Sequence, residues 1–459
     1  MTFWTLDRVA DALEELSAGN PPRGGQQISR VWTDTRTICQ GDLFVALVGE
    51  RFDAHEFVTQ AVASGAVAVV VSRPDVARAL GVPVFEVPDT LAALGALSRY
   101  RRRAWAKPVV GVVGTNGKTS TKELLKAALG AALETHATQG NLNNLVGVPL
   151  TLLAMPDSAD VAVIEMGTNH PGEVARLRAI VEPDVTVVTS IAEEHLEGLG
   201  DLAGVMREEL AACEGVALAV APASQSDVVA EAQKRARVVV AAGLDEGDVR
   251  ADRWDLQADG RGRVTLSGVE IDVPLRGVHN LRNTMLALAV ARELGVSVQQ
   301  AARGIAAMPV PPMRSNVEQI GRVTLVNDAY NSNPGSARAA LELLQHTGHG
   351  RQRVAVLGTM LELGPTGPAL HEALARDALA SPIEIVAGLG EFAVALERLA
   401  AGSVPQRLVT ATDVESLWNR LSSRLEPDAV ILLKASRGVR LEQLVPKIKQ
   451  WAEQLAPNT

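Results

Sequence analysis

Val109-Val-Gly-Val-Val-Gly114-Thr-Asn-Gly-Lys-Thr-Ser120 is the stretch of sequence that decides the fold. It begins as a β-branched run, which predicts a buried strand, and continues into a glycine-rich turn. An apolar stripe with the helical period follows it, at Leu124, Leu125, Ala128 and Leu129. A strand, a glycine-rich turn and a helix in this order predict a phosphate-binding loop.

The residue types in this turn suit the binding of a nucleoside triphosphate. Glycines let backbone N–H groups point inward, and the helix N-terminus adds partial positive charge. Lys118 would reach the β- and γ-phosphates, and the Thr119 hydroxyl would bind Mg²⁺. Val112 stands where the strict Walker pattern has glycine, so the loop is a shorter variant. An ordinary βα turn with a solvated lysine is the alternative, but the flanking elements favour ATP. The expected ATP contacts are Gly114, Thr115, Asn116, Gly117, Lys118, Thr119 and Ser120.

Two further residues follow strands and could bind the metal of a triphosphate. Glu165 ends the run Val161-Ala-Val-Ile164, and His195 follows the run Val185–Thr189. Carboxyl ends of parallel strands meet at one edge of a sheet, which favours a role for Glu165 in binding Mg²⁺. A solvated carboxylate and a satisfied surface histidine are the alternatives, and for His195 spacing alone leaves the two open.

The composition excludes several classes of protein. The net charge of −9 argues against a nucleic-acid surface, which needs a basic patch. Cys39 and Cys213 form no zinc pattern and no disulfide framework. The chain begins without an apolar leader, and its apolar runs have the length of strands. We therefore expect a cytoplasmic protein that does not insert into a membrane.

Strand runs alternate with helical patterns along the chain, which predicts an α/β fold with mostly parallel sheets. We interpret the basic stretch Arg99–Lys107 as a linker, and Pro309-Val-Pro-Pro312 as a second boundary. The residues beyond it predict a Rossmann-like domain, because five strand runs alternate with helices. The predicted domains are 1–105, 106–310 and 311–459, of which the middle one binds ATP.

Several motifs together resemble the Mur ligase family, in that family's order and over essentially the whole chain. They are Gly114-Thr-Asn-Gly-Lys-Thr119, Glu165-Met-Gly167, the turn at His195 and Gly277-Val-His-Asn-Leu-Arg-Asn283. Gln139-Gly-Asn-Leu-Asn-Asn144 and Asn327-Asp-Ala-Tyr-Asn-Ser-Asn-Pro334 are most similar to the MurF branch. Asp34-Thr-Arg36 resembles the uridine-binding region that the MurE and MurF branches share.

The resemblance implies an activity, an architecture and a set of partners. It implies an ATP-dependent carboxylate–amine ligase of peptidoglycan synthesis. Such an enzyme forms an acyl phosphate on UDP-N-acetylmuramoyl-tripeptide, which the amine of D-alanyl-D-alanine attacks, so that phosphate leaves and an amide forms. It implies a small N-terminal domain for the uridine nucleotide, a central ATPase and a C-terminal Rossmann-like domain, and we expect a monomer. A MurE-like ligase, a folylpolyglutamate synthase and an inactive nucleotide-binding protein of the same fold are the alternatives.

The resemblance also implies roles for single residues. Lys118, Glu165, His195, Arg314 and Lys434 match the residues that handle phosphates and metal, and Arg314 matches a contact of the γ-phosphate. Asn280 and Asn283 match residues near adenine, Asp328 a contact of ribose, and Tyr330 a neighbour of the base. The substrate matches are Thr35, Arg36, Asn141, Asn143 and Asn144. Helix caps, linker charges and asparagine turns are the alternatives for these residues. Glu362 and His371 have two possible roles, which the sequence does not separate. One is a contact with D-alanyl-D-alanine, and the other is a structural role next to the helix that follows.

One residue departs from the family pattern. Many Mur ligases have a carbamylated lysine fourteen residues after the metal-binding histidine, and this chain has Glu209 there. Glutamate has the same charge but is shorter by about 3 Å. We therefore predict Thr119, Glu165, His195 and Glu209 as metal ligands, with Glu209 bound directly or through water, and an enzyme that needs no CO₂. A solvated helix charge is the alternative for Glu209.

Overall fold

The computed structural model describes residues 2–17, 19–49, 51–76, 80–311, 313–400 and 405–455. It folds into two compact units. The first contains Met1–Gly111, Glu134–Gly167 and Gly172–Asp184, and the second contains Val112–Leu133, Thr168–Pro171 and Val185–Thr459. The three-domain boundaries stay a prediction, and Pro312 at the second one lies outside the described residues. No helix in the described part of the chain is long and apolar enough to cross a membrane.

The first unit begins with a small parallel sheet in the order β3-β4-β5-β6. Its apolar strands are buried, and Phe85 packs with Leu94 and Leu97 in one core. The elements of this part are β1 (Trp4–Thr5), α1 (Leu6–Ala12), β2 (Gln27–Ile28), β3 (Val31–Trp32), β4 (Leu43–Val45), α2 (Val58–Ala63), β5 (Ala68–Val71), β6 (Val84–Glu86) and α3 (Thr90–Trp105).

The linker predicted at Arg99–Lys107 is wrong, because most of this stretch belongs to α3. Asp89 caps the helix by accepting hydrogen bonds from the backbone N–H groups of Leu91 and Ala92. Arg101 and Arg102 are buried, and the Arg102 guanidinium lies 2.8 Å from the Asp184 carboxylate. The basic run therefore anchors a helix.

The remainder of the first unit carries one strand end of functional interest. β8 (Thr135–Ala137) and β9 (Val161–Glu165) pair in parallel, and Glu165 is the last residue of β9. Two helices accompany these strands, α5 (Gly147–Leu153) and α6 (Glu173–Val181). β7 (Val109–Val113) begins in this unit and ends in the second.

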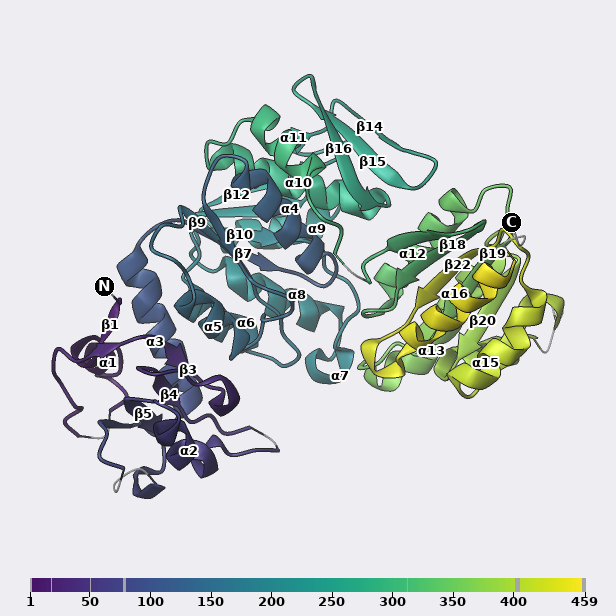
Figure 1. Ribbon diagram of the computed structural model, residues 1–459. Coiled ribbons are helices and arrows are strands. Elements are labelled where there is room, and N and C mark those ends of the chain that lie inside the picture. The colour runs from purple at the N-terminus through teal and green to yellow at the C-terminus, as the bar shows by residue number, and fades with distance from the viewer. Residues whose placement is uncertain are drawn as a thin grey trace. The chain divides into compact units, whose positions relative to one another are not determined.

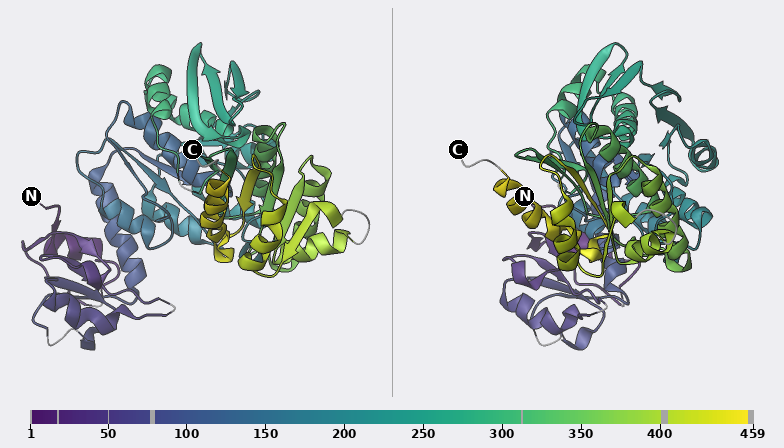
Figure 2. Two further views of the ribbon diagram at one scale, coloured as in Figure 1. Left: turned by 45° about the vertical axis from the view of Figure 1, so that its right-hand side comes forward. Right: turned by 90° about the vertical axis from the view of Figure 1, so that its right-hand side faces the viewer.

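The second unit continues with parallel strands in the order β10-β11-β12-β13. β15 and β16 pair antiparallel as a hairpin and lie side by side in Figure 2. The elements of this part are α4 (Lys118–Gly130), β10 (Val185–Val188), α7 (Leu196–Leu199), α8 (Leu202–Leu210), β11 (Leu218–Pro222), α9 (Ser226–Gln233), β12 (Val238–Gly243), β13 (Val249–Arg250), β14 (Arg253–Leu256), β15 (Arg261–Leu266), β16 (Val269–Arg276), α10 (Val278–Glu293) and α11 (Val298–Ala306).

The C-terminal part of this unit is an α/β sheet, as the alternation of strands and helices predicts, with strands in the order β17-β18-β22-β19-β20-β21. All pair in parallel except β17, an antiparallel edge strand. Helices lie on both faces of the sheet (Figure 1), which buries its apolar strands. The elements are β17 (Asn316–Ile320), β18 (Val323–Asp328), α12 (Pro334–Thr347), β19 (Arg353–Leu357), α13 (Gly367–Ala380), β20 (Ile385–Leu389), α14 (Glu391–Ala400), β21 (Leu408–Ala411), α15 (Val414–Leu421), β22 (Val430–Lys434) and α16 (Leu444–Gln454).

Candidate nucleotide-binding site

The glycine-rich loop lies between β7 and the first turn of α4, as the sequence predicts. Gly117 has a φ of +89°, and a Cβ there would lie 2.7 Å from the Asn283 amide nitrogen. Gly114 has a φ of +119°, and a Cβ there would lie 2.8 Å from the Ser190 carbonyl oxygen and still closer to the Thr189 hydroxyl. Only glycine suits these two positions, because both the backbone conformation and the space exclude a side chain.

The loop is fastened to the turn that follows β10. The Thr115 N–H donates to the Ser190 carbonyl at 2.7 Å, and the Asn116 N–H donates to the Ser190 hydroxyl at 3.1 Å. The Thr115 hydroxyl donates to the Ala192 carbonyl at 3.2 Å. These bonds hold the loop in one shape before any phosphate arrives.

Lys118 is folded back over the loop that precedes it. Its ammonium donates to the Gly114 carbonyl and, at 3.3 Å, to the Thr115 carbonyl. The Glu194 carboxylate lies 3.9 Å away. The positive charge of Lys118 therefore lies at the phosphate-binding loop, where it can attract an anionic phosphate.

Glu209 binds the same loop through a buried hydrogen bond. Its side chain is buried, and its Oε2 accepts a hydrogen bond of 2.7 Å from the Gly114 N–H. Burial raises the pKa of this carboxyl, while the nearby Lys118 charge opposes the shift. The solvated helix charge considered for Glu209 is therefore wrong, whereas its role as a metal ligand stays a prediction.

His195 lies at the edge of this region in a left-handed conformation, with a φ of +53°. Its Nδ1 contacts the Glu362 carboxylate, and its Nε2 lies 3.7 Å from Glu194. Glu362 also has a positive φ, of +65°. Sequence reasoning missed the part of Glu194, although its place directly before His195 was a signal that could have found it.

Glu165 is held within the first unit by two polar neighbours. The Asn143 amide donates to Glu165 Oε1 at 2.9 Å, and the Glu165 N–H donates to the Thr138 hydroxyl at 2.9 Å. Asn144 accepts from the Val146 and Gly147 N–H groups, so it shapes its own turn. Asn141 is exposed in the same loop. Contacts of these asparagines with a substrate stay a prediction.

The donor set suits a metal that arrives with a phosphate. The described residues hold no group of three or more His, Cys, Asp or Glu side chains that could bind a metal ion by themselves. Mg²⁺ in nucleotide sites keeps waters and phosphate oxygens and needs only one or two protein carboxylates. The oxygen donors of Thr119 and Glu209, both in the second unit, fit that pattern. The full set of predicted ligands, which adds Glu165 and His195, stays a prediction.

Residues of the C-terminal part reach the loop. The Arg314 guanidinium lies 4.1 Å from the centre of the Tyr330 ring and 3.4 Å from the Thr119 hydroxyl. Lys434 forms an ion pair of 2.7 Å with Asp328, and both side chains are buried. The structure therefore brings Arg314 to the loop and pairs Asp328 with Lys434.

The two asparagines predicted near adenine lie on α10, and both are buried. A Cβ on Gly117 would meet the Asn283 side chain, so Asn283 lies directly beside the loop. Asn280 donates to the Arg276 carbonyl at 2.8 Å and also to His279. Burial lowers the pKa of His279 to about 4, so this ring is neutral near pH 7. Ser120 is buried in the first turn of α4.

Thr35 and Arg36 belong to a 3₁₀ turn in the first unit. The Asp34 side chain accepts from the Arg36 N–H and pairs with its guanidinium at 2.7 Å. The Arg36 side chain lowers the pKa of Asp34 through this hydrogen bond. The Arg36 side chain is exposed, and uridine binding at this turn stays a prediction.

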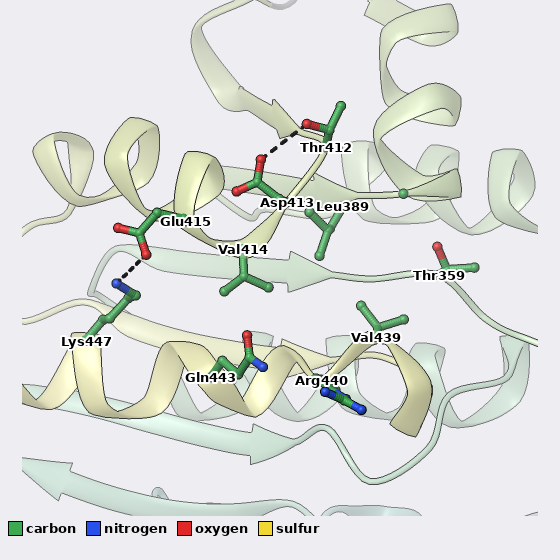
Figure 3. Close-up of a pocket in the computed structure, with 11 residues that line it drawn as sticks. Thr359, Leu389, Thr412, Asp413, Val414, Glu415, Val439, Arg440, Gln443 and Lys447 are labelled. Carbon is green, nitrogen blue, oxygen red and sulfur yellow. Dashed lines mark hydrogen bonds and ion pairs between the residues drawn. The ribbon is translucent and has the colours of Figure 1, made fainter.

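A cavity of about 510 Å³ opens at the carboxyl ends of β20 and β21 (Figure 3). Arg440 and Lys447 supply positive charge, and Asp413 and Glu415 supply negative charge. Lys447 pairs with Glu415 at 2.7 Å. The remaining lining residues are Thr359, Leu389, Gly390, Thr412, Val414, Val439 and Gln443. A cavity with both signs of charge suits a small zwitterion.

His371 lies in the fold close to this cavity but does not line it. Its ring accepts from the Met360 N–H at 2.8 Å and contacts the Gly367 carbonyl at 2.7 Å. Both ring nitrogens are occupied by backbone groups, and burial lowers the pKa of the ring. His371 therefore fixes the loop that carries Glu362.

Comparisons with known proteins agree with this geometry. Family models match three stretches: "Mur ligase family, catalytic domain" at residues 27–102, "Mur ligase middle domain" at 112–291, and "Mur ligase, glutamate ligase domain" at 313–437. A relative from Bacillus subtilis is 32% identical over 96% of this chain and 97% of its own length. The chain belongs to the Mur ligase family.

Two relatives that align over nearly the whole chain carry the same name. Those from Bacillus subtilis and Escherichia coli are UDP-N-acetylmuramoyl-tripeptide–D-alanyl-D-alanine ligases, and the latter is 34% identical over 97% of this chain and 98% of its own. A crystal structure of MurF from Acinetobacter baumannii has a TM-score of 0.88 and 30% identity, and covers 97% of this chain and 99% of that one. MurF from Thermotoga maritima in complex with ADP has a TM-score of 0.81 and 27% identity, over 94% and 99%. The predicted family and α/β fold are confirmed.

Proposed function

We propose that this chain is an ATP-dependent ligase that joins D-alanyl-D-alanine to UDP-N-acetylmuramoyl-tripeptide. The observation that carries the proposal is the preformed phosphate loop with Lys118 folded over it. The names of relatives aligned over nearly the whole chain support the choice of substrates. The product would be a pentapeptide precursor of peptidoglycan.

The reaction has two steps. The terminal carboxylate of the tripeptide attacks the γ-phosphorus of ATP, the bond to ADP breaks, and an acyl phosphate forms. The neutral amine of D-alanyl-D-alanine then attacks the acyl carbon. The C–N bond forms, the nitrogen loses its proton, and the C–O bond to phosphate breaks.

Charge neutralisation and positioning would supply most of the rate enhancement, because the reaction needs no protein nucleophile. Lys118 would neutralise the β- and γ-phosphates, and the backbone N–H groups of the loop would fix their place. Arg314 approaches Thr119 and would meet the γ-phosphate. Bound Mg²⁺ would polarise the phosphate oxygens, with the Thr119 hydroxyl as one of its ligands.

We place the dipeptide in the C-terminal cavity. Thr359 in its lining is three residues before Glu362, which contacts His195. Three residues span about 11 Å at most, so a ligand there lies within reach of the phosphate region. Arg440 would bind the dipeptide carboxylate by a charge-assisted hydrogen bond.

The choice of acceptor separates this activity from its closest alternative. The enzyme is offered ATP, Mg²⁺ and either UDP-muramoyl dipeptide with a free amino acid or UDP-muramoyl tripeptide with D-alanyl-D-alanine. ADP release with the second pair alone supports the proposal. ADP release with the first pair assigns a MurE-like activity. If neither pair leads to ADP release, the result would point to a nucleotide-binding protein without catalysis.

A further inference from the structure

The segment between β18 and α12 touches the phosphate loop through its side chains. Asn333 is the N-cap of α12, and its Oδ1 accepts from the Ser336 N–H at 2.9 Å. Its Nδ2 donates to the Asn116 side-chain oxygen at 2.9 Å. One amide therefore caps a helix with its oxygen and holds the phosphate loop with its nitrogen.

The contact is close, and its Asn333 side is buried. Asn333 is only 3% exposed. A Cβ on the neighbouring Gly335 would lie 3.2 Å from the Asn116 amide nitrogen, so α12 begins directly against the loop. Because the Asn333 amide is buried, loss of this bond would leave its Nδ2 without a hydrogen-bond acceptor.

A second bond from the same segment reaches the counter-charge of Lys118. The Asn331 amide donates to Glu194 Oε1 at 3.2 Å, while Glu194 Oε2 lies 3.9 Å from the Lys118 ammonium. The Asn331 carbonyl accepts from Lys434 at 2.7 Å. The segment 331–333 thus contacts the loop, the Lys118 counter-charge and Lys434.

We propose that Asn333 and Asn116 are positioning residues that hold the phosphate loop against the start of α12 in its nucleotide-binding shape. This proposal rests on the nucleotide binding in the proposed function, but not on the choice of ligase substrates. Direct binding of ADP reports on the loop whether or not the ligase substrates are correctly assigned. Failure of the ligase assay and failure of this proposal are therefore distinct results.

The test removes the bridge and keeps the helix cap. In Asn333→Ser the hydroxyl still caps α12 but is too short to reach Asn116. We expect the Kd for ADP to rise about fivefold, the fold-change that corresponds to one neutral hydrogen bond. Asp89→Ser makes a matched change at the cap of α3, which is outside the site, and leaves the Kd unchanged.

A double-mutant cycle separates the bridge from an unrelated loss of structure. Asn116→Ala is made alone and with Asn333→Ser, and thermal unfolding is measured for all variants. If the pair acts as proposed, the double variant binds ADP no more weakly than the weaker single variant. The proposal is overturned if the fold-change in Kd of the double variant equals the product of the two single fold-changes. It is also overturned if Asn333→Ser leaves the Kd unchanged. If Asn333→Ser does not fold, the cycle is run with Asn333→Thr.

Discussion

Replacing Glu209 separates its hydrogen bond to the phosphate loop from its charge. Glu209→Gln keeps an acceptor oxygen of the same reach, whereas Glu209→Leu removes it and leaves the Gly114 N–H without its 2.7 Å partner. The cost of an unsatisfied buried donor is about 2 kcal/mol, within a range of about 1–3 kcal/mol. That free energy corresponds to a factor of about 30 in an equilibrium constant.

Calorimetric titration with ADP measures this factor as the ratio of the two dissociation constants. The leucine variant is expected to bind ADP about 30-fold more weakly than the glutamine variant. Global stability is a poor guide here, because removing a buried carboxylate also removes the free-energy cost of burying it. Equal affinities in the two variants would refute the reasoning that Glu209 orders the loop.

Three further changes test other parts of the molecule. A CO₂-depleted preparation should lose no activity, because Glu209 carries its own carboxylate; strong rescue by bicarbonate would contradict this. Arg440→Gln should raise the KM for D-alanyl-D-alanine about tenfold and leave the KM for ATP unchanged, while Arg437→Gln, outside the cavity lining, changes neither; a matching rise in both constants would count against the cavity. His279 has a pKa of about 4 in the folded protein and about 6.5 in the unfolded chain. The free energy of unfolding is therefore unaffected by this ring above pH 6.5, and it decreases by up to about 3 kcal/mol as the pH falls towards 4. Urea unfolding at pH 7 and pH 5 should show a smaller loss in His279→Asn, and an equal loss would exclude this residue as the cause.

Local features of the site could be predicted from the sequence. The phosphate loop is one continuous stretch, and its glycines, β-branched strand and amphipathic helix each indicate the same structure. The Rossmann-like part followed from the same kind of alternation. The prediction of a linker at Arg99–Lys107 was wrong, because it assumed that a run of charged residues is exposed to solvent. Arg101 and Arg102 instead bury their side chains and form ion pairs.

Contacts between distant segments could not be predicted in this way. Asn333 meets Asn116 across 217 positions, and His195 meets Glu362 across 167. No periodicity or spacing relates such residues, because tertiary packing alone brings them together. Glu209 is intermediate: its position in the family pattern indicated a role, but its bond to the Gly114 N–H required the structure.

The most direct test of the central claim measures ADP release with ATP, Mg²⁺, UDP-muramoyl tripeptide and D-alanyl-D-alanine, omitting each in turn. The proposed function predicts release that needs all four, with a pentapeptide product identified by mass. Turnover that ignores D-alanyl-D-alanine, or that requires a different carboxylate, would contradict it.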